Sequence, residues 1–285
     1  MKNESVIIIG GDKRQEYIYN VLSADGYNCY IENRTTDYIE EKLSECRYVI
    51  LPLPVSKDNK HIYCKNIDFI LSFEDLCNML TDRHKVFAGG LNKHQLYLLD
   101  EKEIKYYDYS DSEEFLVYNA FLTAQGALKL LLDNTDKSLT RNKALITGYG
   151  RIGKALANLL SKLNVSVTVC VRSNGQFNLA ECMGFDAMKF DDLKRNLYDV
   201  DYVFNTVPQC VFNEEHIANM KSDAIYFELA SAPYGVDRAI FDSRHARFVD
   251  GGALPGRYTP CSAGEIIAKI IDTTIRRSDS NGKET

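Results

Sequence analysis

Short apolar runs alternate with stretches of helical periodicity along nearly the whole chain. The first run, SVIII, is followed by two glycines and by a helical pattern that starts near Asp12. Further strand-like runs follow at 28–32, 48–54, 85–90 and 105–109, with helical stretches between several of them. This alternation is typical of a parallel sheet with helices on both faces, so the first part of the chain is predicted to be an α/β domain.

The same alternation returns in the second half of the chain. Its first strand-like run, KALITG, begins at residue 143 and precedes a helical pattern over 151–163. The runs VSVTVCVRS, AMKF, DYVFNTVP, AIYFELAS and RFVDGG continue it, with further helices near 176–183 and 213–220. We therefore predict two Rossmann-like, doubly wound parallel-sheet domains that flank a cleft and are joined by long helices.

The domain boundaries follow from the same pattern. We place the N-terminal, substrate-side domain at 1–118 and expect a C-terminal helix at 262–278 to complete it. A linker helix is placed at 119–140, in a helical pattern that begins at Glu113, and the cofactor-binding domain at 141–257. No internal repeat shorter than the two similar halves is expected.

Composition and charge narrow the class of function. The chain has 34 Lys and Arg against 40 Asp and Glu, which gives a net charge of -6. It therefore lacks the excess of positive charge that binds nucleic acid or an anionic membrane. Its 8 cysteines are scattered without a CxxC pair, which favours reduced thiols and no metal site. No window suggests a membrane span. We therefore expect a cytoplasmic protein that acts on small molecules.

Three closely spaced glycines stand where the first strand of the second half meets its helix. In GYGRIG, Gly148 permits a tight turn, Gly150 allows the backbone to approach a pyrophosphate, and Gly153 allows close packing of helix on strand. The alternative is a glycine-rich corner that binds nothing. Because a strand precedes the motif and a helix and second strand follow it, we predict a dinucleotide site. The predicted cofactor-binding residues of this corner are Gly148, Tyr149, Gly150, Arg151, Ile152 and Gly153.

The end of the second strand predicts which dinucleotide binds. An acidic side chain there would accept hydrogen bonds from a ribose hydroxyl of NAD, but Val171, Arg172 and Ser173 include no carboxylate. Arg172 and Ser173 suit the charge of a 2'-phosphate, so we predict NADP as the cofactor. The alternative is a solvated arginine in an ordinary loop.

Two later strand ends supply further residues to the edge of the sheet where the cofactor is expected to bind, which we call the rim. The carboxyl ends of strands in such sheets are where ligands bind. We therefore expect the cofactor's nicotinamide or its ribose to contact Asn205, Thr206, Val207 and Pro208. Ser231, which follows the next strand, is expected on the same rim. The alternative for Asn205 is a cap at the end of its strand.

The first domain offers candidate groups for an anionic substrate. GGDKRQ lacks the third glycine of a dinucleotide turn, but a helix N-terminus beside Arg14 would bind a carboxylate, with a bidentate contact from the guanidinium. Ser56 and Asn92 also follow predicted strands. We expect all three to face the cleft, with a surface arginine as the alternative for Arg14.

The motifs taken together resemble those of the A subunits of dipicolinate synthases. The resemblance runs from Val6 to about Ile271 and so covers nearly the whole chain. Relatives often have an acidic residue where Gln125 stands and Asp where Glu228 stands. The matching stretches are IIGGDKRQ, LPLPVS, NAFLTAQG, GYGRIG, NTVP, ELAS with PYGVD, and LPGRYTPCSAG.

This resemblance implies a specific activity. The A subunit of that family works with a flavoprotein-like B subunit to convert dihydrodipicolinate, or its 4-hydroxy-tetrahydro precursor, into dipicolinate with NADP, in the mother cell of a sporulating bacterium. The dicarboxylate substrate is then expected to bind Arg14, Ser56 and Asn92 on one side and Ser231 or Arg257 on the other. None of the five histidines lies in these motifs, so no acid or base is assigned.

Two other functions remain open from the sequence. A non-catalytic partner that binds nucleotide would explain the missing acid or base. A dehydrogenase of the hydroxyacid or alanine type would need a catalytic His with a carboxylate, or Lys with His, and neither pattern is found. The helix at 263–277 is expected either to cross back onto the first domain or to form a contact within a homo-oligomer.

Overall fold

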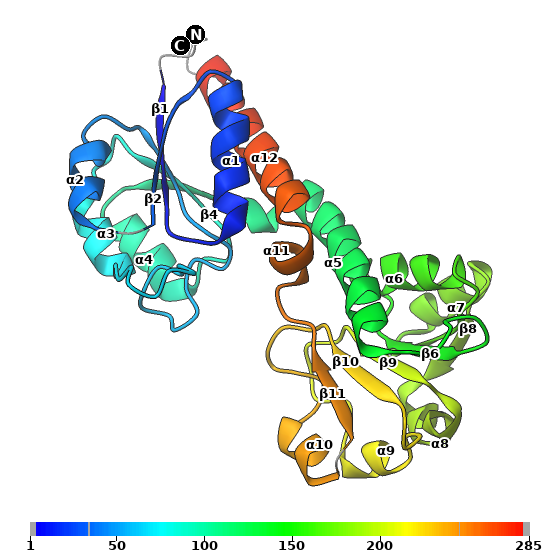
Figure 1. Cartoon of the computed structure of the whole chain (residues 1–285). Coiled ribbons are helices and arrows are strands. Elements are labelled where there is room, and N and C mark those ends of the chain that lie inside the picture. The colour runs from blue at the N-terminus through cyan, green and yellow to red at the C-terminus, as the bar shows by residue number, and fades with distance from the viewer. Residues whose placement is uncertain (1–3, 34, 245, 282–285) are drawn as a thin grey trace. The chain divides into compact units, whose positions relative to one another are not determined.

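The computed structural model contains two compact α/β units. Each has one parallel sheet with helices on both faces, which confirms the predicted pair of Rossmann-like domains (Figure 1). Unit 1 comprises Met1–Asn119 with Thr259–Thr285, and unit 2 comprises Ala120–Tyr258. The structure describes residues 4–33, 35–244 and 246–281.

The sheet of unit 1 has five parallel strands in the order β2-β1-β3-β4-β5. Its second strand in this order, β1, is fully buried from Val6 onward, because helices cover both of its faces. Ile7 of β1 is in register with Tyr30 on one side and with Val49 on the other. The strands are β1 (Ser5–Ile9), β2 (Asn28–Glu32), β3 (Tyr48–Ile50), β4 (Lys85–Ala88) and β5 (Lys105–Asp108).

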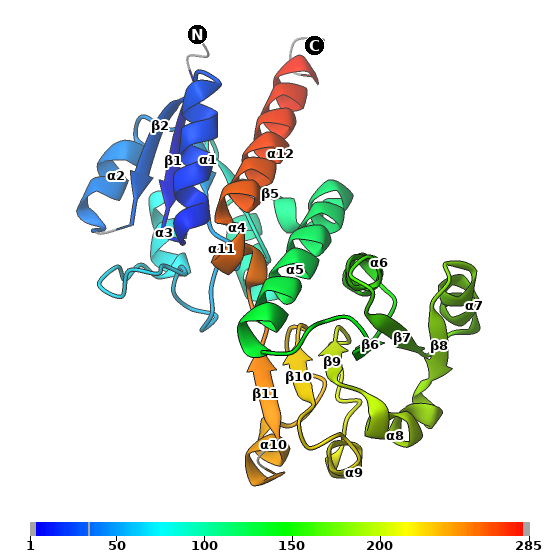
Figure 2. The same cartoon turned by 45° about the vertical axis from the view of Figure 1, so that its right-hand side comes forward.

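Two helices from opposite ends of the chain cover one face of this sheet. Helices α1 (Lys13–Ala24) and α12 (Pro260–Asn281) lie side by side in both views (Figure 1 and Figure 2). Ile18 of α1 and Ile267 and Ile271 of α12 share a core with the sheet. The opposite face is covered by α2 (Asp37–Leu43), α3 (Phe73–Met79) and α4 (Lys93–Glu101).

The sheet of unit 2 has six parallel strands in the order β11-β10-β9-β6-β7-β8. The strand order reverses at β6, with β7 and β8 on one side of it and β9 to β11 on the other. In doubly wound sheets such a switch point is where ligands bind. The strands are β6 (Lys143–Thr147), β7 (Ser166–Val171), β8 (Asp186–Lys189), β9 (Tyr202–Asn205), β10 (Ile225–Glu228) and β11 (Arg247–Asp250).

Two separate cores cover the faces of this second sheet. On one face Leu131 of α5, Leu156 of α6 and Ala180 of α7 pack together. On the other, Leu193 of α8 and Phe241 of α10 pack with a cluster of aromatic side chains. The helices are α5 (Glu113–Asn134), α6 (Arg151–Ser161), α7 (Asn174–Cys182), α8 (Leu193–Asn196), α9 (Glu214–Ala218), α10 (Arg238–Arg244) and α11 (Leu254–Tyr258), and the short 3-10 helices are η1 (Tyr109–Asp111), η2 (Phe190–Asp192) and η3 (Leu197–Asp199).

The linker helix α5 differs from the predicted span of 119–140. It begins at Glu113, where the Ser112 hydroxyl caps the Phe115 amide at 3.2 Å. It ends at Asn134, and Thr135 then makes a 3.1 Å hydrogen bond to the Tyr202 hydroxyl. The polar stretch after Asn134 is therefore held on unit 2 by side-chain hydrogen bonds instead of continuing the helix.

Helix α5 is also unusually apolar. Among the described residues it is the one helix whose length of 22 residues and mean hydropathy of 1.4 would suit a membrane span. Half of this apolar stretch is buried inside the protein. Ala124, Ala127 and Leu131 on its inward side belong to the core of unit 2, so packing within the protein accounts for the buried half of this apolar stretch.

Unit 1 contains a short internal repeat that the sequence prediction missed. Strand β1 leads into GGDKRQEY and strand β4 into GGLNKHQLY. In both, a short polar residue caps the helix, and the glutamine at the third helical position closes a capping box: Asp12 with Gln15, and Asn92 with Gln95. The two strands flank β3, so matching corners occupy the same edge of the sheet.

Candidate functional site

Strand β6 ends at a glycine corner that leads directly into helix α6. Gly148 has φ = +88°, a conformation that residues with a side chain rarely adopt. A Cβ at Gly153 would lie 2.2 Å from the Gly148 carbonyl oxygen, so the helix packs against the turn. A Cβ at Gly150 would meet no atom within 4 Å. The corner therefore combines a tight turn, close helix packing and an open backbone, as a pyrophosphate-binding loop requires.

The N-terminus of α6 is left uncapped by side chains. Helix α6 begins after Gly150, which has no side chain to offer. By contrast, Asp12 caps α1, Asn92 caps α4 and Ser173 caps α7. The amides of the first turn of α6 and the positive end of its dipole therefore fit the pyrophosphate of a dinucleotide.

The other predicted residues of this corner differ in exposure. Tyr149 is only 3% exposed, and its ring meets Phe185 edge-on with 6.1 Å between ring centroids. Ile152 packs against the same core, whereas Arg151 is exposed. The side chain of Tyr149 therefore serves the core, and that of Ile152 packs against it while remaining half-buried.

The predicted phosphate-recognition residues lie at the carboxyl end of β7. Arg172 is exposed, and its guanidinium carbon lies 5.7 Å from the ring centroid of Phe190. The Ser173 hydroxyl accepts a 3.2 Å hydrogen bond from the Gln176 amide as the cap of α7. The neighbouring strand adds Lys189, whose Nζ donates to the Arg172 carbonyl oxygen at 3.1 Å. Two cationic side chains thus stand at this strand end.

A buried hydrogen-bond network connects the carboxyl ends of β6, β9 and β10. The Thr147 hydroxyl donates to Asn205 Oδ1 at 2.6 Å, and Asn205 Nδ2 donates to Glu228 Oε1 at 2.6 Å. The Tyr226 hydroxyl donates to Glu228 Oε2 at 3.0 Å. All four side chains are at most 1% exposed. Asn205 is therefore a buried link between strand ends, and it does not contact the cofactor rim through an exposed amide.

The burial of this network affects its acidic groups. Burial raises the pKa of Glu228, and the hydrogen bonds from Asn205, Gly235, Ala230 and Tyr226 act in the opposite direction. The pKa of Tyr226 is raised by burial and by the adjacent Glu228 carboxylate. The tyrosine therefore stays protonated and acts as a donor to Glu228.

The remaining residues of the rim in unit 2 surround the glycine corner. Thr206 donates to the Thr147 carbonyl oxygen at 2.7 Å, and Val207 is half-buried beside Gly148. Pro208 and Ser231 are exposed after β9 and β10. The structure thus brings the predicted contacts from the two strands to adjacent strand ends.

Arg257, in helix α11, lies beside the carboxyl end of β11, the strand next to β10. Its guanidinium donates to the carbonyl oxygens of Asp250 at 3.2 Å and Gly252 at 3.4 Å. The same group lies over the Tyr258 ring, 5.2 Å from its centroid. The exposed guanidinium therefore closes the turn between β11 and α11.

Arg14 of unit 1 is arranged differently from the substrate anchor that the sequence suggested. It is 5% exposed, and its Nε and Nη2 donate to the two carboxylate oxygens of Asp12 at 2.9 Å and 2.8 Å. Nη2 also donates to the Leu53 carbonyl oxygen. Because Asp12 occupies both the bidentate edge of the guanidinium and the N-terminus of α1, a substrate carboxylate cannot take that place in this arrangement.

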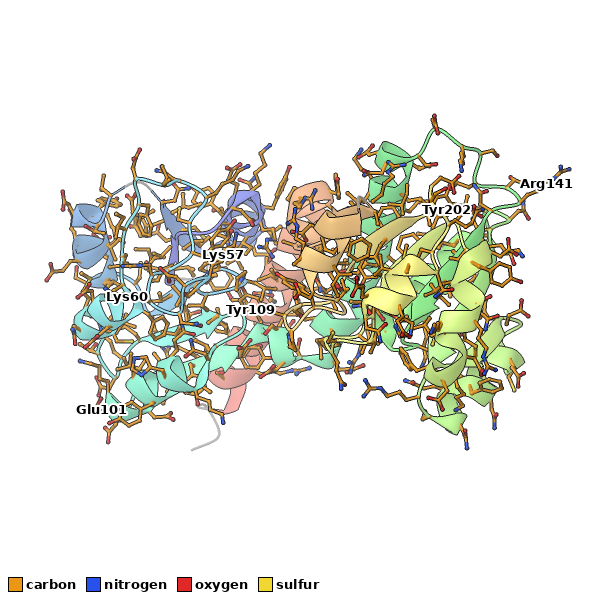
Figure 3. All side chains as sticks on the ribbon, turned by 90° about the horizontal axis from the view of Figure 1, so that it is seen from below. Lys57, Lys60, Glu101, Tyr109, Arg141 and Tyr202 are labelled. Carbon is orange, nitrogen blue, oxygen red and sulfur yellow. The ribbon has the colours of Figure 1, made fainter. Side chains whose placement is uncertain are left out.

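Ser56 and Asn92 lie on the same edge of the unit 1 sheet as Arg14. Ser56 donates to Asp58 Oδ1 at 2.9 Å, and Asn92 donates to Asn59 Oδ1 at 3.3 Å. Both contacts involve the loop that follows β3. This loop also carries Lys57 and Lys60 (Figure 3), and Lys57 Nζ lies 3.9 Å from the ring centroid of Tyr63. Both lysines are exposed, and neither shares the bidentate contact that Asp12 makes with Arg14.

The described histidines differ in their surroundings, and His94 is exposed in the first turn of α4. His84 is buried against the Leu43 carbonyl oxygen, and His216 closes the capping box of α9. His61 pairs with Asp58, 2.7 Å away, on the loop after β3. His245 lies outside the described residues. Within the described residues, no group of three or more His, Cys, Asp or Glu could hold a metal ion.

Three residues at these strand ends were not predicted from the sequence. Thr147 and Glu228 are the last residues of β6 and β10, and Lys189 is the last residue of β8. Their positions at the ends of apolar runs were visible in the sequence, because a polar residue closing a buried strand marks the ligand edge of such a sheet. What was not visible is that their side chains meet those of neighbouring strands.

Comparison with known proteins agrees with this geometry. Residues 5–110 match the family model for the N-terminal domain of the dipicolinate synthase A subunit, and residues 121–253 match the D-isomer specific 2-hydroxyacid dehydrogenase, NAD binding domain. The A subunit of dipicolinate synthase from Bacillus subtilis (strain 168) is 24% identical over 284 residues, which cover 95% of each chain. The resemblance drawn from the motifs is therefore confirmed.

Solved structures show the same fold over the full length. The crystal structure of the dipicolinate synthase A subunit from Bacillus halodurans superposes with a TM-score of 0.84 at 23% identity, covering 95% of this chain and 97% of that one. The corresponding crystal structure from Bacillus subtilis gives 0.84 at 22% identity, covering 99% and 98%. Together with the family model matched by residues 121–253, this gives unit 2 the fold of a nicotinamide-dinucleotide-binding domain of the oxidoreductase type.

Proposed function

We propose that this protein is the NADP-dependent catalytic component of a dipicolinate synthase. In this proposal it oxidises dihydrodipicolinate, or its 4-hydroxy-tetrahydro precursor with loss of one water, to dipicolinate in the cytoplasm of the mother cell during sporulation. The observation that carries the proposal is the uncapped glycine corner of residues 148–153, in a chain whose N-terminal domain resembles that of the dipicolinate synthase A subunit. The glycine corner is the evidence for a nicotinamide dinucleotide cofactor, and the similarity of the N-terminal domain is the evidence for the substrate class.

The residues of the corner fit the cofactor. Gly150 leaves space for the pyrophosphate, and as the N-cap of α6 it makes no side-chain cap hydrogen bond. When bound, the nicotinamide ring would accept a hydride from the substrate. The chain's own contribution is to hold the ring beside residues 206–208 and Ser231, and to keep that rim rigid through the buried Asn205 and Glu228.

The preference for NADP rests on charge at the end of β7. No carboxylate stands at residues 171–174, where NAD-specific sites place one. Arg172 and Lys189 supply two cationic groups in adjacent strands. A 2'-phosphate carries two negative charges, and charge-assisted hydrogen bonds to it are strong, so this strand end favours NADP over NAD.

The substrate side of the proposal needs revision for Arg14. Since Asp12 holds the guanidinium, we assign the direct contact with a substrate carboxylate to other groups on this edge, namely Ser56, Asn92 and the exposed Lys57. Ser231 and Arg257 remain proposed contacts in unit 2. Arg14 then acts indirectly, because it fixes the loop after β3 through the Leu53 carbonyl oxygen.

A second candidate function is a non-catalytic partner that binds nucleotide. It is favoured by the histidines, since His84 and His216 are used in structural hydrogen bonds. A hydroxyacid-type dehydrogenase needs a catalytic histidine with a carboxylate, and the pair that offers this pattern is His61 with Asp58 on the loop after β3. The proposed partner, the flavoprotein-like B subunit of a dipicolinate synthase, would then supply the chemistry.

Absorbance at 340 nm tests the proposal directly. The purified chain, alone and with the B subunit, is mixed with freshly generated 4-hydroxy-tetrahydrodipicolinate and NADP+. Reduction of NADP+ together with formation of dipicolinate is expected. Cofactor binding without reduction in either mixture would favour the non-catalytic function, and absence of binding would exclude both.

A further inference from the structure

Glu228 is a buried carboxylate with four hydrogen-bond donors. At 1% exposure it receives bonds from Asn205 Nδ2 at 2.6 Å, the Gly235 amide at 2.8 Å, the Tyr226 hydroxyl at 3.0 Å and the Ala230 amide at 3.1 Å. The amide groups can only donate. The described part of the chain gives the Tyr226 hydroxyl no other acceptor. These contacts therefore match the ionised form of Glu228.

Among the described residues this negative charge has no cationic partner. Within residues 4–33, 35–244 and 246–281, no Lys, Arg or His forms an ion pair with Glu228. Only neutral dipoles stabilise the carboxylate, so its field is not cancelled locally. Buried charges are screened far less by salt than exposed ones, and the field therefore extends to the neighbouring strand ends.

The position of the charge connects it to the proposed cofactor. Glu228 is the last residue of β10, and through Asn205 and Thr147 it is linked to the last residues of β9 and β6. These three strands are adjacent, and Thr147 directly precedes the glycine corner. Ligands of doubly wound sheets bind outside such carboxyl ends. The carboxylate thus lies beneath the rim assigned to the nicotinamide half.

We propose that Glu228 makes the site prefer the oxidised form of the cofactor. An oxidised nicotinamide ring carries one positive charge, a reduced ring carries none, and the rest of the dinucleotide is the same in both. A buried anion beneath the ring stabilises the first form selectively. In a medium of effective dielectric about 20, one unit charge about 12 Å away changes affinity by roughly tenfold. This inference rests on the proposed nicotinamide cofactor and adds the redox state that the site selects.

A purely structural role would have a different signature. Glu228 also holds the loop over residues 230–235, since it accepts bonds from both the Ala230 and the Gly235 amides. Loss of that support would weaken both redox forms alike. The ratio of the two dissociation constants therefore separates the electrostatic role from the structural one.

Calorimetry on the full chain measures this ratio. Wild type is expected to bind NADP+ at least as tightly as NADPH. Glu228→Gln is expected to shift the ratio of affinities by about tenfold toward NADPH, because it removes the charge. Glu228→Asp retains the charge and is expected to keep the ratio within about twofold, even where both affinities fall. Glu181→Gln, which removes an exposed charge on α7, is the matched control and should leave the ratio unchanged.

The outcomes are distinct. Equal weakening of both forms by Glu228→Gln, or no change, overturns the inference while leaving the proposed cofactor intact. If Glu228→Gln does not fold, the wild-type protein alone tests the inference. Wild type that binds NADPH more than about tenfold tighter than NADP+ contradicts a stabilising anion. A wild-type chain that binds neither NADP nor NAD in either redox form refutes the proposed function itself, and this inference with it.

Discussion

Gly264 of α12 packs directly on the backbone of Arg14 in α1. A Cβ at Gly264 would lie 2.6 Å from the Arg14 carbonyl oxygen and 2.7 Å from the Tyr17 Cβ. The glycine of the C-terminal SAG motif thus permits the close contact between the last helix and the helix that carries Arg14. Tyr27 adds a hydrogen bond to Asp272 at 2.8 Å along the same interface. The C-terminal segment is consequently an integral part of unit 1.

Gly264→Ala is expected to destabilise unit 1. Neither neighbouring atom is the flexible end of a side chain, so the helices must separate, at a cost of roughly 1–3 kcal/mol in the free energy of unfolding. Thermal unfolding followed by circular dichroism measures the effect. Cys261→Ala, at an exposed position on the same helix, is the control and should change stability by less than about 0.5 kcal/mol. Equal midpoints for both variants would contradict the close packing.

The glycine corner gives a pair of variants with opposite expectations. Gly153→Ala places a Cβ against the Gly148 carbonyl oxygen and is expected to lower the stability of unit 2 by roughly 1–3 kcal/mol. Gly150→Ala meets no neighbouring atom and should preserve stability. It should still weaken cofactor binding, because the methyl group projects where the pyrophosphate approaches. Calorimetric binding and thermal melts of both variants check this; unaltered cofactor affinity in Gly150→Ala would place the pyrophosphate elsewhere.

Arg172 and Lys189 are expected to determine cofactor preference. Arg172→Ala should reduce the ratio of kcat/KM for NADP+ over NAD+ by about tenfold, through loss of a charge-assisted hydrogen bond to the 2'-phosphate. Lys189→Ala should act in the same direction. Initial rates with both cofactors provide the measurement. Arg195→Ala, another exposed arginine of unit 2, serves as the control. A ratio that stays the same in both test variants would remove the basis for the NADP assignment.

The Asp12 and Arg14 pair predicts a pH-dependent stability. Burial acts to raise the pKa of Asp12, but the hydrogen bonds and charge of Arg14 outweigh it, so the folded-state pKa lies below the ordinary value of 3.8. A carboxyl group with a lowered pKa contributes stability above 3.8, and this stability is lost as the pH falls through the folded-state pKa. Unit 1 should therefore become less stable below pH 3.8, and Arg14→Ala should remove that dependence.

Arg14→Ala also tests the indirect role of Arg14. Removal of one partner from this largely buried pair is expected to cost roughly 2–4 kcal/mol at neutral pH. Denaturant unfolding between about pH 3 and pH 7 measures both effects. Lys13→Ala removes the same charge from the adjacent exposed position and is the control. If Lys13→Ala and Arg14→Ala gave the same pH profile, general charge rather than the pair would be responsible.

The sequence by itself determined the local elements and the cofactor corner. Strand β2 lies at the predicted 28–32, and β6 leads into a helix at the predicted Arg151. Apolar runs and helical periodicity are local properties, so they could be read without the fold. The glycines of residues 148–153 were equally readable, because a tight turn and close helix packing constrain residue type at fixed spacing.

Only the tertiary structure decided how side chains from distant strands meet. The sequence suggested Arg14 as a free guanidinium, but the fold pairs it with Asp12 and Leu53. The sequence assigns Glu228 no role at the site, and the fold encloses it with Asn205 from another strand. Hydrogen bonds of this kind depend on which strands are neighbours and on which groups are removed from water. These are long-range properties that no local pattern encodes, and they determine which charges remain available to a ligand.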